Sequence, residues 1–255
     1  MNIATVNLRI DVASDGKDAW KFRVPFLASL FQASDWDVVG TQEGNLRMLA
    51  DLMPGIPRFS RLGLPRSGED ETCAILYDPS RLELRHSGTF WLSETPERES
   101  RFPGSCFLRI CTWAEFLPRE GSRFRLFNTH LDYFGPEIRT RQLGVLLDRM
   151  KGLDAADPLP VFLTGDFNAE PEDPCFSLLR DFRLRGGRSL LSAGDRFRIA
   201  GRTFHAFAGE GPGKPIDHVF FSSDRDCVFA RIRVDRDREG NFPSDHFPLE
   251  ARFRP

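Results

Sequence analysis

The sequence predicts an α/β (α+β) fold, a four-layer sandwich in which two mixed β-sheets pack face to face and helices flank them. The main observation is the order of the patterns. Helical and strand periods alternate near both ends of the chain, whereas residues 72–132 form a run of strands. A purely parallel sheet does not accommodate such a run, because helices join its strands. Polar residues also follow many of the predicted strands, as expected if the strand ends gather along one edge.

The first part of the chain reads as strand, helix, strand, helix. A strand over residues 2–8 comes first, and a helix follows Trp20 because apolar residues recur on one helical stripe. A second strand covers residues 35–43, and a second helix starts near Leu46 and stops at Pro54-Gly55. Both strands end in polar residues.

Alternating and β-branched residues predict a meander of strands in the middle of the chain. These strands cover residues 73–77, 81–92, 106–117 and 123–132, with an exposed loop over 93–104. A helix over 135–151, a strand ending at Gly165, a short helix near 174–180 and an irregular stretch to Pro215 follow. The last strands cover residues 216–222, 227–234 and 246–253. No low-complexity linker or repeat interrupts these patterns, so we expect one domain over residues 1–255.

The composition is that of an ordinary globular protein. With 40% hydrophobic residues, 28% charged residues and a formal net charge of -2, the chain lacks the positive excess that attracts nucleic acid or anionic membranes without specificity. Its five cysteines are scattered without a CxxC pair, so we expect reduced core thiols rather than disulfides or a zinc site. We find no basic-then-apolar leader and no apolar run of membrane length, and we expect a cytoplasmic location.

Asp166 and Asn168 stand out at the end of the strand that runs into Gly165. Because neighbouring residues of a strand point to opposite faces, these two side chains share one side and Phe167 points to the other. A carboxylate and a carboxamide placed together can hold a cation and a phosphate group. The alternative is an ordinary Asp/Asn turn after a strand, and this segment alone does not decide between the two.

Six polar strand ends, taken in order, resemble one family. They are Asn7, Gln42-Glu43, Asn128–Asp132, Gly165–Asn168, Ile216–His218 and Ser244–His246. In this order and spacing they resemble the endonuclease/exonuclease/phosphatase superfamily, which includes pancreatic deoxyribonuclease, and the resemblance covers essentially the whole chain. Residues 88–96 and 203–205 look like a bacterial subgroup whose substrates are poorly defined. The resemblance implies a deoxyribonuclease I-like fold.

The resemblance also implies a divalent metal site. Glu43 matches the main metal-ligating carboxylate of the family, and Asn7 and Asp245 would hold the ion with it, directly or through water. Oxygen ligands of this kind suit Mg²⁺ or Mn²⁺. Each of these residues, taken alone, is more often a turn or capping residue.

Catalytic roles follow from the same resemblance. Asp166 and Asn168 match the pair that positions the attacking water and contacts the scissile phosphate. His246 matches the histidine that faces this phosphate, and Asp217 matches the carboxylate that orients its ring. An imidazole held by a buried carboxylate can donate to or accept from a phosphate oxygen near neutral pH.

Five further residues carry weaker assignments. His130 resembles a second phosphate-side histidine, which Glu71 would orient. Arg109 could bind phosphate oxygens, with an ion pair as the alternative, and His205 could reach the substrate from a loop, with simple packing as the alternative. Arg9 stands where some family nucleases carry an acidic residue, and we expect it to form a structural ion pair.

The residues and the resemblance together predict a divalent-metal-dependent phosphoesterase, most simply a phosphodiesterase or nuclease that hydrolyses its substrate by in-line attack of water. A phosphomonoesterase acting on a sugar or inositol phosphate is the alternative on the same fold, and a non-catalytic binding protein is the alternative of another class. We expect a monomer without a membrane span whose partner is a phosphate ester, with nucleic acid among the candidates. Neither the fold nor the motifs identify the substrate.

Overall fold

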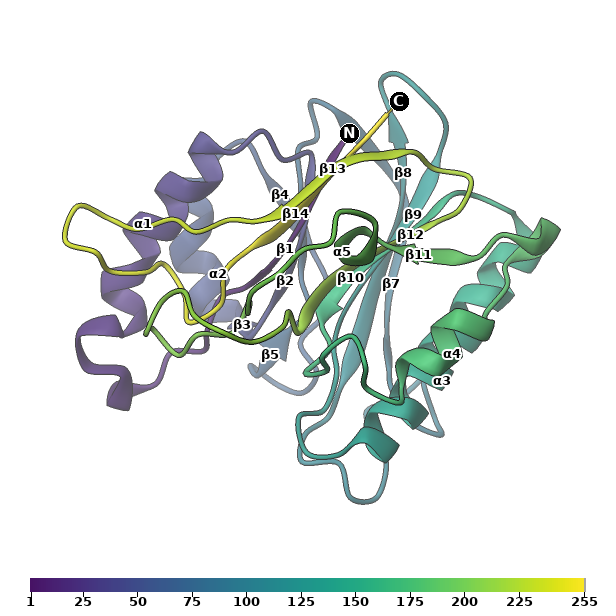
Figure 1. The fold of residues 1–255 in the computed structure, drawn as a ribbon, viewed down its shortest axis with the longest axis horizontal. Coiled ribbons are helices and arrows are strands. Elements are labelled where there is room, and N and C mark those ends of the chain that lie inside the picture. Colours follow the sequence, from purple (N-terminus) through teal and green to yellow (C-terminus); the bar gives the residue numbers. More distant parts are fainter. Residues whose placement is uncertain (255) are drawn as a thin grey trace.

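Two mixed six-stranded sheets pack face to face in the computed structural model, which describes residues 1–254 (Figure 1). The first sheet consists of β13 (Cys227–Ile232), β14 (Leu249–Phe253), β1 (Asn2–Asn7), β2 (Val38–Gln42), β6 (Ile75–Tyr77) and β4 (Ser60–Leu62), in this order. The second consists of β11 (Leu190–Ser192), β12 (Asp217–Ser222), β10 (Val161–Asp166), β9 (Phe124–His130), β8 (Ile110–Pro118) and β7 (Leu82–Trp91). A separate pair joins β3 (Gly44–Asn45) and β5 (Glu71–Thr72).

Helices cover the outer face of each sheet, which completes the four layers (Figure 1). The helices α1 (Trp20–Ala33) and α2 (Leu46–Leu52) share a hydrophobic cluster with the first sheet. The helices α3 (Pro136–Ala156) and α4 (Phe176–Asp181) share one with the second sheet, and a third cluster lies between the sheets. The short helix α5 (Ala193–Arg196) and three 3₁₀ turns (Ala13–Asp18, Met53–Gly55 and Arg185–Gly187) complete the elements. The predicted fold class is confirmed.

The first two helices form for the reasons that the sequence suggests. Trp20, Leu27 and Phe31 lie on one stripe of α1 and are fully buried. The helix α2 begins after Asn45, whose side-chain oxygen accepts a hydrogen bond of 2.9 Å from the backbone N–H of Met48. Such a cap satisfies a donor that the first helical turn would otherwise leave free.

The structure differs from the predicted elements in several places. The strand predicted from residue 106 begins at Ile110, because the Asp132 carboxylate instead binds the Ser105 hydroxyl at 2.7 Å and the Cys106 backbone N–H at 2.9 Å. The strand predicted from His246 begins three residues later, at Leu249. The stretch predicted to be irregular before Pro215 contains β11 and α5, and β4 was also missed. These elements have three or four residues, too few to show a period.

The polar strand ends of both sheets gather at one edge. The strands β1 and β2 are parallel and place Asn7 opposite Gln42. The strands β9 and β10 are also parallel and place His130 opposite Asp166, and the antiparallel strand β12 places Asp217 on the other side of Asp166. Because carboxyl ends of parallel strands meet at one edge, this register brings side chains that are distant in sequence together.

A buried polar seam holds the two sheets together close to this edge. Asn128 on β9 accepts a hydrogen bond of 2.7 Å from Gln42 of the opposite sheet, and it donates to the backbone oxygens of Thr41 at 2.9 Å and Ala74 at 3.0 Å. Gly40 permits this approach, since a Cβ atom there would lie 2.3 Å from the side-chain oxygens of both Asn128 and Thr164. The separation of the sheets at the edge is therefore fixed by directional bonds.

All five cysteines are free thiols, as the sequence predicts, and four of them are buried. Within residues 1–254, no helix combines the length and the apolar character that crossing a bilayer requires.

We expect Gly40→Ala to lower the free energy of unfolding by about 2–3 kcal/mol, because the added methyl group must displace the buried side chains of Asn128 and Thr164. Urea unfolding measures the change. Gly152→Ala in α3 is the matched control, because its Cβ would meet open space and a helical Gly→Ala change stabilises by about 0.5–1 kcal/mol. Equal effects of the two substitutions would show that the sheets do not depend on close approach at Gly40.

Candidate active site

Asp166 lies at the centre of the edge where the polar strand ends meet. It is the last residue of β10, between His130 on β9 and Asp217 on β12. The side chain is 1% exposed, and it accepts hydrogen bonds from Asn7 Nδ2 at 2.9 Å and from the backbone N–H of Asn168 at 2.8 Å. A buried carboxylate without donors would be strongly destabilising, so these bonds fix the position of the charge.

His246, in the loop before β14, forms a carboxylate–imidazole pair with Asp217. Its Nδ1 lies 2.8 Å from Asp217 Oδ2, and its Nε2 lies 3.8 Å from Asp166 Oδ2. Burial alone would lower the pKa of His246, but the surrounding carboxylates, first that of Asp217, outweigh burial and raise the pKa to about 10. The imidazole is therefore charged at neutral pH, and its Nε2–H faces the edge as a donor.

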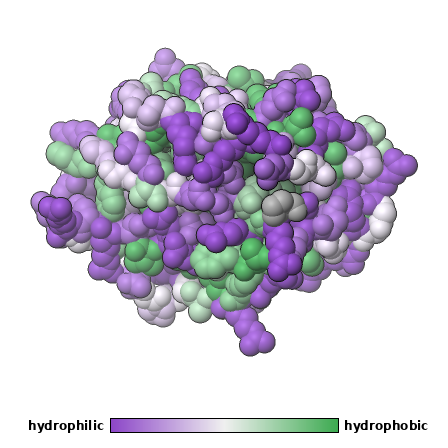
Figure 2. Space-filling view, turned by 90° about the horizontal axis from the view of Figure 1, so that it is seen from above, coloured by the Kyte–Doolittle hydropathy of each residue, from purple (hydrophilic) through white to green (hydrophobic). Residues whose placement is uncertain are grey.

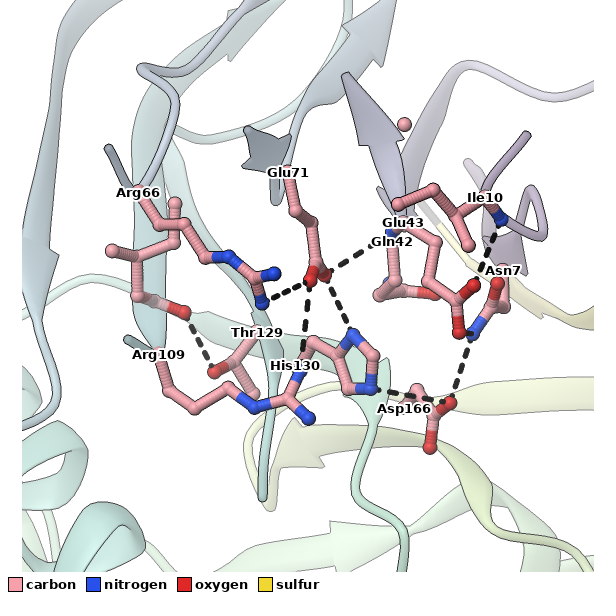
Figure 3. A network of polar contacts seen from close by, with 12 residues as sticks. Asn7, Ile10, Gln42, Glu43, Arg66, Glu71, Arg109, Thr129, His130 and Asp166 are labelled. Atoms are coloured by element: carbon pink, nitrogen blue, oxygen red, sulfur yellow. Dashed lines mark hydrogen bonds and ion pairs between the residues drawn. The ribbon is translucent and has the colours of Figure 1, made fainter. Parts of the chain in front are cut away.

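Glu71 and His130 form a second carboxylate–imidazole pair (Figure 3). His130 lies opposite Asp166 on the neighbouring strand β9. His130 Nδ1 lies 2.6 Å from Glu71 Oε1, and its Nε2 lies 3.0 Å from Asn168 Nδ2. Burial would raise the pKa of Glu71, but His130, Arg109 and Arg66 together lower it. Arg66 binds Glu71 Oε2 at 2.7 Å, a contact that the sequence did not indicate because Arg66 lies in an irregular loop. Glu71 thus stays ionised and holds the ring.

Glu43 follows β2 and brings a further carboxylate to this edge (Figure 3). Its Oε1 accepts a hydrogen bond of 3.1 Å from Asn7 Nδ2, and its Oε2 accepts one of 2.8 Å from the backbone N–H of Ile10. One ligand atom each of Glu43, His130 and Asp166 lie within 4.8 Å of one another. This spacing can accommodate a single metal ion.

The negative charge of this edge fits a divalent cation. Asp245 is 3% exposed, and its pKa is raised to about 6, first by burial and then by the charge of Glu43, despite the opposing effects of His246 and two arginines. A cation between these carboxylates would relieve the repulsion. The candidate metal ligands here are the carboxylate oxygens of Glu43, Asp245 and Asp166. Such oxygens suit hard ions such as Mg²⁺ or Mn²⁺. The residues present therefore fit the metal that the sequence predicts.

Arg109 and His205, for each of which the sequence left two roles open, are both almost fully buried. Arg109 is 3% exposed, with its Nη1 3.6 Å from Glu71 Oε2 and its guanidinium beneath the ring of Phe107. His205 is 2% exposed and stacks on Phe247 with 3.9 Å between ring centroids. These contacts agree with an ion pair for Arg109 and with packing for His205, and contact with a substrate stays a prediction for both residues.

Three residues of the edge have left-handed backbone conformations. The φ angles are 53° at Arg9, 63° at Glu43 and 48° at Asn168. Residues with a Cβ atom rarely adopt this region, and such strain clusters at functional sites. Arg9 forms the expected ion pair, with its Nε 3.0 Å from Asp15 and 3.6 Å from Asp245.

Thr203 and Phe204 support the His246 pair, a role that no sequence pattern indicates. The Thr203 hydroxyl accepts a hydrogen bond of 3.1 Å from the backbone N–H of Asp217. Phe204 pairs with His246 through a β-bridge, and their ring centroids lie 5.1 Å apart. In the sequence, only the resemblance of residues Thr203–His205 to the bacterial subgroup pointed to these two residues. Their residue types alone do not indicate a catalytic role.

Comparisons with known proteins agree with this geometry. A model of the Endonuclease/Exonuclease/phosphatase family matches residues 6–246. A mannosyl-6-phosphatase of Bacteroides thetaiotaomicron is 29% identical, with a TM-score of 0.90 and 100% of both chains covered. A protein of Enterococcus faecalis described as functionally unknown is 29% identical, with a TM-score of 0.89 and coverage of 100% of this chain and 99% of that one.

A more distant likeness shows the fold alone. Truncated TDP2 of Caenorhabditis elegans is 21% identical, with a TM-score of 0.77 and coverage of 100% of this chain and 97% of that one. A search of curated proteins found no match. With the family model spanning nearly the whole chain and every predicted strand end at one edge, the protein belongs to the endonuclease/exonuclease/phosphatase family, whose members hydrolyse phosphate esters with divalent metals.

Proposed function

We propose that this protein is a divalent-metal-dependent phosphoesterase that hydrolyses its substrate by in-line attack of water. One observation carries the proposal. Two imidazoles, each held by its own buried carboxylate, place Nε2 within 3.7 Å and 3.8 Å of the same oxygen of Asp166. A carboxylate that can accept a proton and two ring nitrogens that can contact phosphate oxygens are what phosphoryl hydrolysis requires.

Each side chain has a proposed part in this reaction. Asp166 accepts a hydrogen bond from the attacking water and takes its proton, and Asn168 orients the same water. As the new P–O bond forms, the ester P–O bond breaks and the alcohol leaves, its oxygen taking up one proton in balance with the proton that water gives to Asp166, while negative charge builds on the phosphate oxygens. His246, charged because of Asp217, donates from Nε2 to one of these oxygens. His130, on the opposite strand neighbour of Asp166, faces another.

Glu43, Asn7 and Asp245 would hold the metal ion, with Asp166 near enough to share it. When bound, the ion would polarise the phosphate and neutralise part of its charge. Asn7 now donates its amide N–H to both Glu43 and Asp166. Its oxygen accepts a hydrogen bond of 2.9 Å from the backbone N–H of Arg9, so direct coordination through this oxygen would require the amide to turn and exchange these bonds for the metal ion.

The substrate that the comparisons favour is a sugar phosphate monoester. The Bacteroides mannosyl-6-phosphatase matches this chain at 29% identity over the full length of both chains. The TDP2 structures, one of them with a single-stranded DNA product, match at 17–21% identity, which carries the fold but no substrate. A net charge of -2 also gives no general attraction to nucleic acid. We therefore place the monoester first, and the phosphodiester favoured by the sequence becomes the second candidate.

A substrate panel tests this proposal. Purified protein with Mg²⁺ or Mn²⁺ is given mannose 6-phosphate, glucose 6-phosphate, bis-p-nitrophenyl phosphate and a single-stranded oligonucleotide. We expect kcat/KM for a sugar phosphate to exceed that for either diester by at least about tenfold, or 1.4 kcal/mol in the barrier, and EDTA to abolish turnover. His246→Ala serves as the control for contaminating phosphatases. Faster diester hydrolysis would favour the phosphodiesterase, and metal binding without any turnover would favour the binding protein.

The pairing of Asp217 with His246 predicts a specific titration. In the metal-free protein we expect the ring of His246 to stay charged up to a pKa of about 10, so its NMR signals should not change between neutral and mildly alkaline pH. Asp217→Asn leaves the ring buried but removes its main partner, so the pKa should fall toward the ordinary value of about 6.5. Asp148→Asn, at an exposed position of α3, is the control and should change nothing. A histidine that titrates near 6.5 in the unaltered protein would contradict the pairing.

A further inference from the structure

Exposed aromatic side chains gather around the active-site edge. Within residues 1–254, six aromatic side chains are exposed, and four of them border this edge: Phe107, Tyr133, Phe134 and Phe204. Figure 2 looks onto the other end of the molecule, from which β1 runs toward Asn7, and mostly hydrophilic residues surround scattered hydrophobic ones there. Exposed apolar side chains that gather beside a site commonly mark the place where a ligand binds.

We propose that Phe204 determines the substrate specificity of this site by binding the sugar ring of a phosphate monoester, an inference that rests on the proposed function. The Phe204 side chain is 45% exposed, and its ring centroid lies 5.1 Å from that of His246. His246 Nε2 in turn lies 3.8 Å from Asp166 Oδ2, where the phosphate would bind. A sugar ring attached to this phosphate, directly or through one carbon atom, would therefore lie within reach of Phe204.

The backbone on both sides of Phe204 directs this side chain outward. Phe204 pairs with His246 in an antiparallel β-bridge, and the backbone N–H of Phe247 donates a hydrogen bond of 2.8 Å to the backbone oxygen of Thr203. In such an extended segment neighbouring side chains point to opposite faces. Thr203 and His205 are buried, at 0% and 2% exposure, so Phe204 between them faces out. A ring held in this way loses little freedom when a ligand covers it.

The in-line reaction places the alcohol of the ester on the Phe204 side. Asn168, which orients the attacking water in the proposed reaction, lies on the His130 side of Asp166, with 3.0 Å between its Nδ2 and His130 Nε2. The attacking and leaving oxygens of an in-line displacement lie roughly opposite each other across the phosphorus atom. The leaving alcohol therefore points away from Asn168 and toward His246 and Phe204.

The aromatic side chains on the His130 side fit a neutral sugar less well. Phe107 is contacted by two guanidinium groups, since Arg66 Cζ lies 4.7 Å and Arg109 Cζ lies 5.5 Å from its ring centroid. These cations occupy part of the ring surface. Among the described residues, no arginine or lysine lies over the Phe204 ring at such a distance. Phe204 therefore offers a free, uncharged surface.

A phenyl ring recognises the shape of a sugar rather than its hydroxyl groups. It forms no conventional hydrogen bond, but it can cover the C–H face of a pyranose, which removes apolar surface of both rings from water. The open chain of a sugar alcohol presents the same phosphate and hydroxyl groups without this flat face. In a 5′-nucleotide the base lies beyond the furanose, so the ring nearest to the phosphate is again a sugar. We therefore expect Phe204 to favour a cyclic sugar phosphate over its open-chain counterpart.

Mannose 6-phosphate and mannitol 1-phosphate form a matched pair of substrates, because they share the carbon chain and the phosphate but only the first closes a ring. We expect kcat/KM with Mn²⁺ to be at least about tenfold higher for the cyclic compound, and Phe204→Ala to reduce this ratio below about twofold. Phe204→Trp should keep the ratio, because it keeps a flat apolar ring. Phe134→Ala is the control and should also keep the ratio, because Phe134 is 71% exposed on the His130 side.

The ratio of the two rate constants separates contact with the sugar from support of His246 alone. If Phe204 only supported His246, Phe204→Ala would slow hydrolysis of both compounds equally and leave the ratio unchanged, which would overturn the inference. The absence of a preference in the unaltered protein, or its loss in Phe134→Ala instead of Phe204→Ala, would overturn it as well.

Failure of the proposed function gives a different result. If neither compound is hydrolysed, the monoesterase is wrong, and calorimetric titration of both compounds into the protein with Mn²⁺ decides the role of Phe204. Binding of mannose 6-phosphate at least about tenfold tighter than that of mannitol 1-phosphate, with the difference lost in Phe204→Ala, would retain this role. Equal binding of the two compounds, or no binding of either, would overturn it.

Discussion

Buried negative charge at one edge of the sandwich is the constraint on which the rest of this structure depends. Asp166, Asp217 and Asp245 are each at most 3% exposed, and Glu43 lies beside them. Carboxylates in such surroundings are stable only with donors or cations close by. The protein supplies amide donors and the charged ring of His246. Burial, and after it the charge of Glu43, still raises the pKa of Asp245.

The fold can hold this charge because the two sheets are fastened to each other just behind it. Asn128 bonds across the sheets to Gln42, and Gly40 lets the two surfaces approach. Parallel pairing within each sheet then aligns the strand ends. Left-handed backbone at Glu43 and Asn168 turns each chain as it leaves its strand, so that strain is concentrated at this edge.

The centre of the site could be predicted from the sequence because its residues lie at or beside strand ends. Asp166, Asn168, Asp217 and His246 lie at or near strand ends, and strand periodicity with the family resemblance was enough to group them. Their roles remain proposals, whereas their proximity is an observation. The sandwich fold could also be predicted from the sequence, because long amphipathic segments show a clear helical or strand period.

The residues whose contacts the sequence does not indicate are those that act through tertiary contacts alone. Arg66 reaches Glu71 from an irregular loop, and Thr203 binds the backbone of Asp217 from 14 residues away. No period marks such contacts. For His205 the sequence left substrate contact and packing open, and in the structure the ring stacks on Phe247 and is 2% exposed. For a lone polar residue in a loop, the sequence does not show whether the side chain will face the substrate site or the core.

The most direct test of the central claim is the affinity of the metal-free protein for Mn²⁺, measured by calorimetry. We expect the unaltered protein to bind the ion at this edge and Glu43→Gln to bind it at least about tenfold more weakly, because one carboxylate charge is lost from the site. Glu69→Gln is the matched control, since Glu69 is exposed and outside the site, and its affinity should be unchanged. Equal affinity of Glu43→Gln and the unaltered protein would show that the buried charge at this edge does not serve a metal ion.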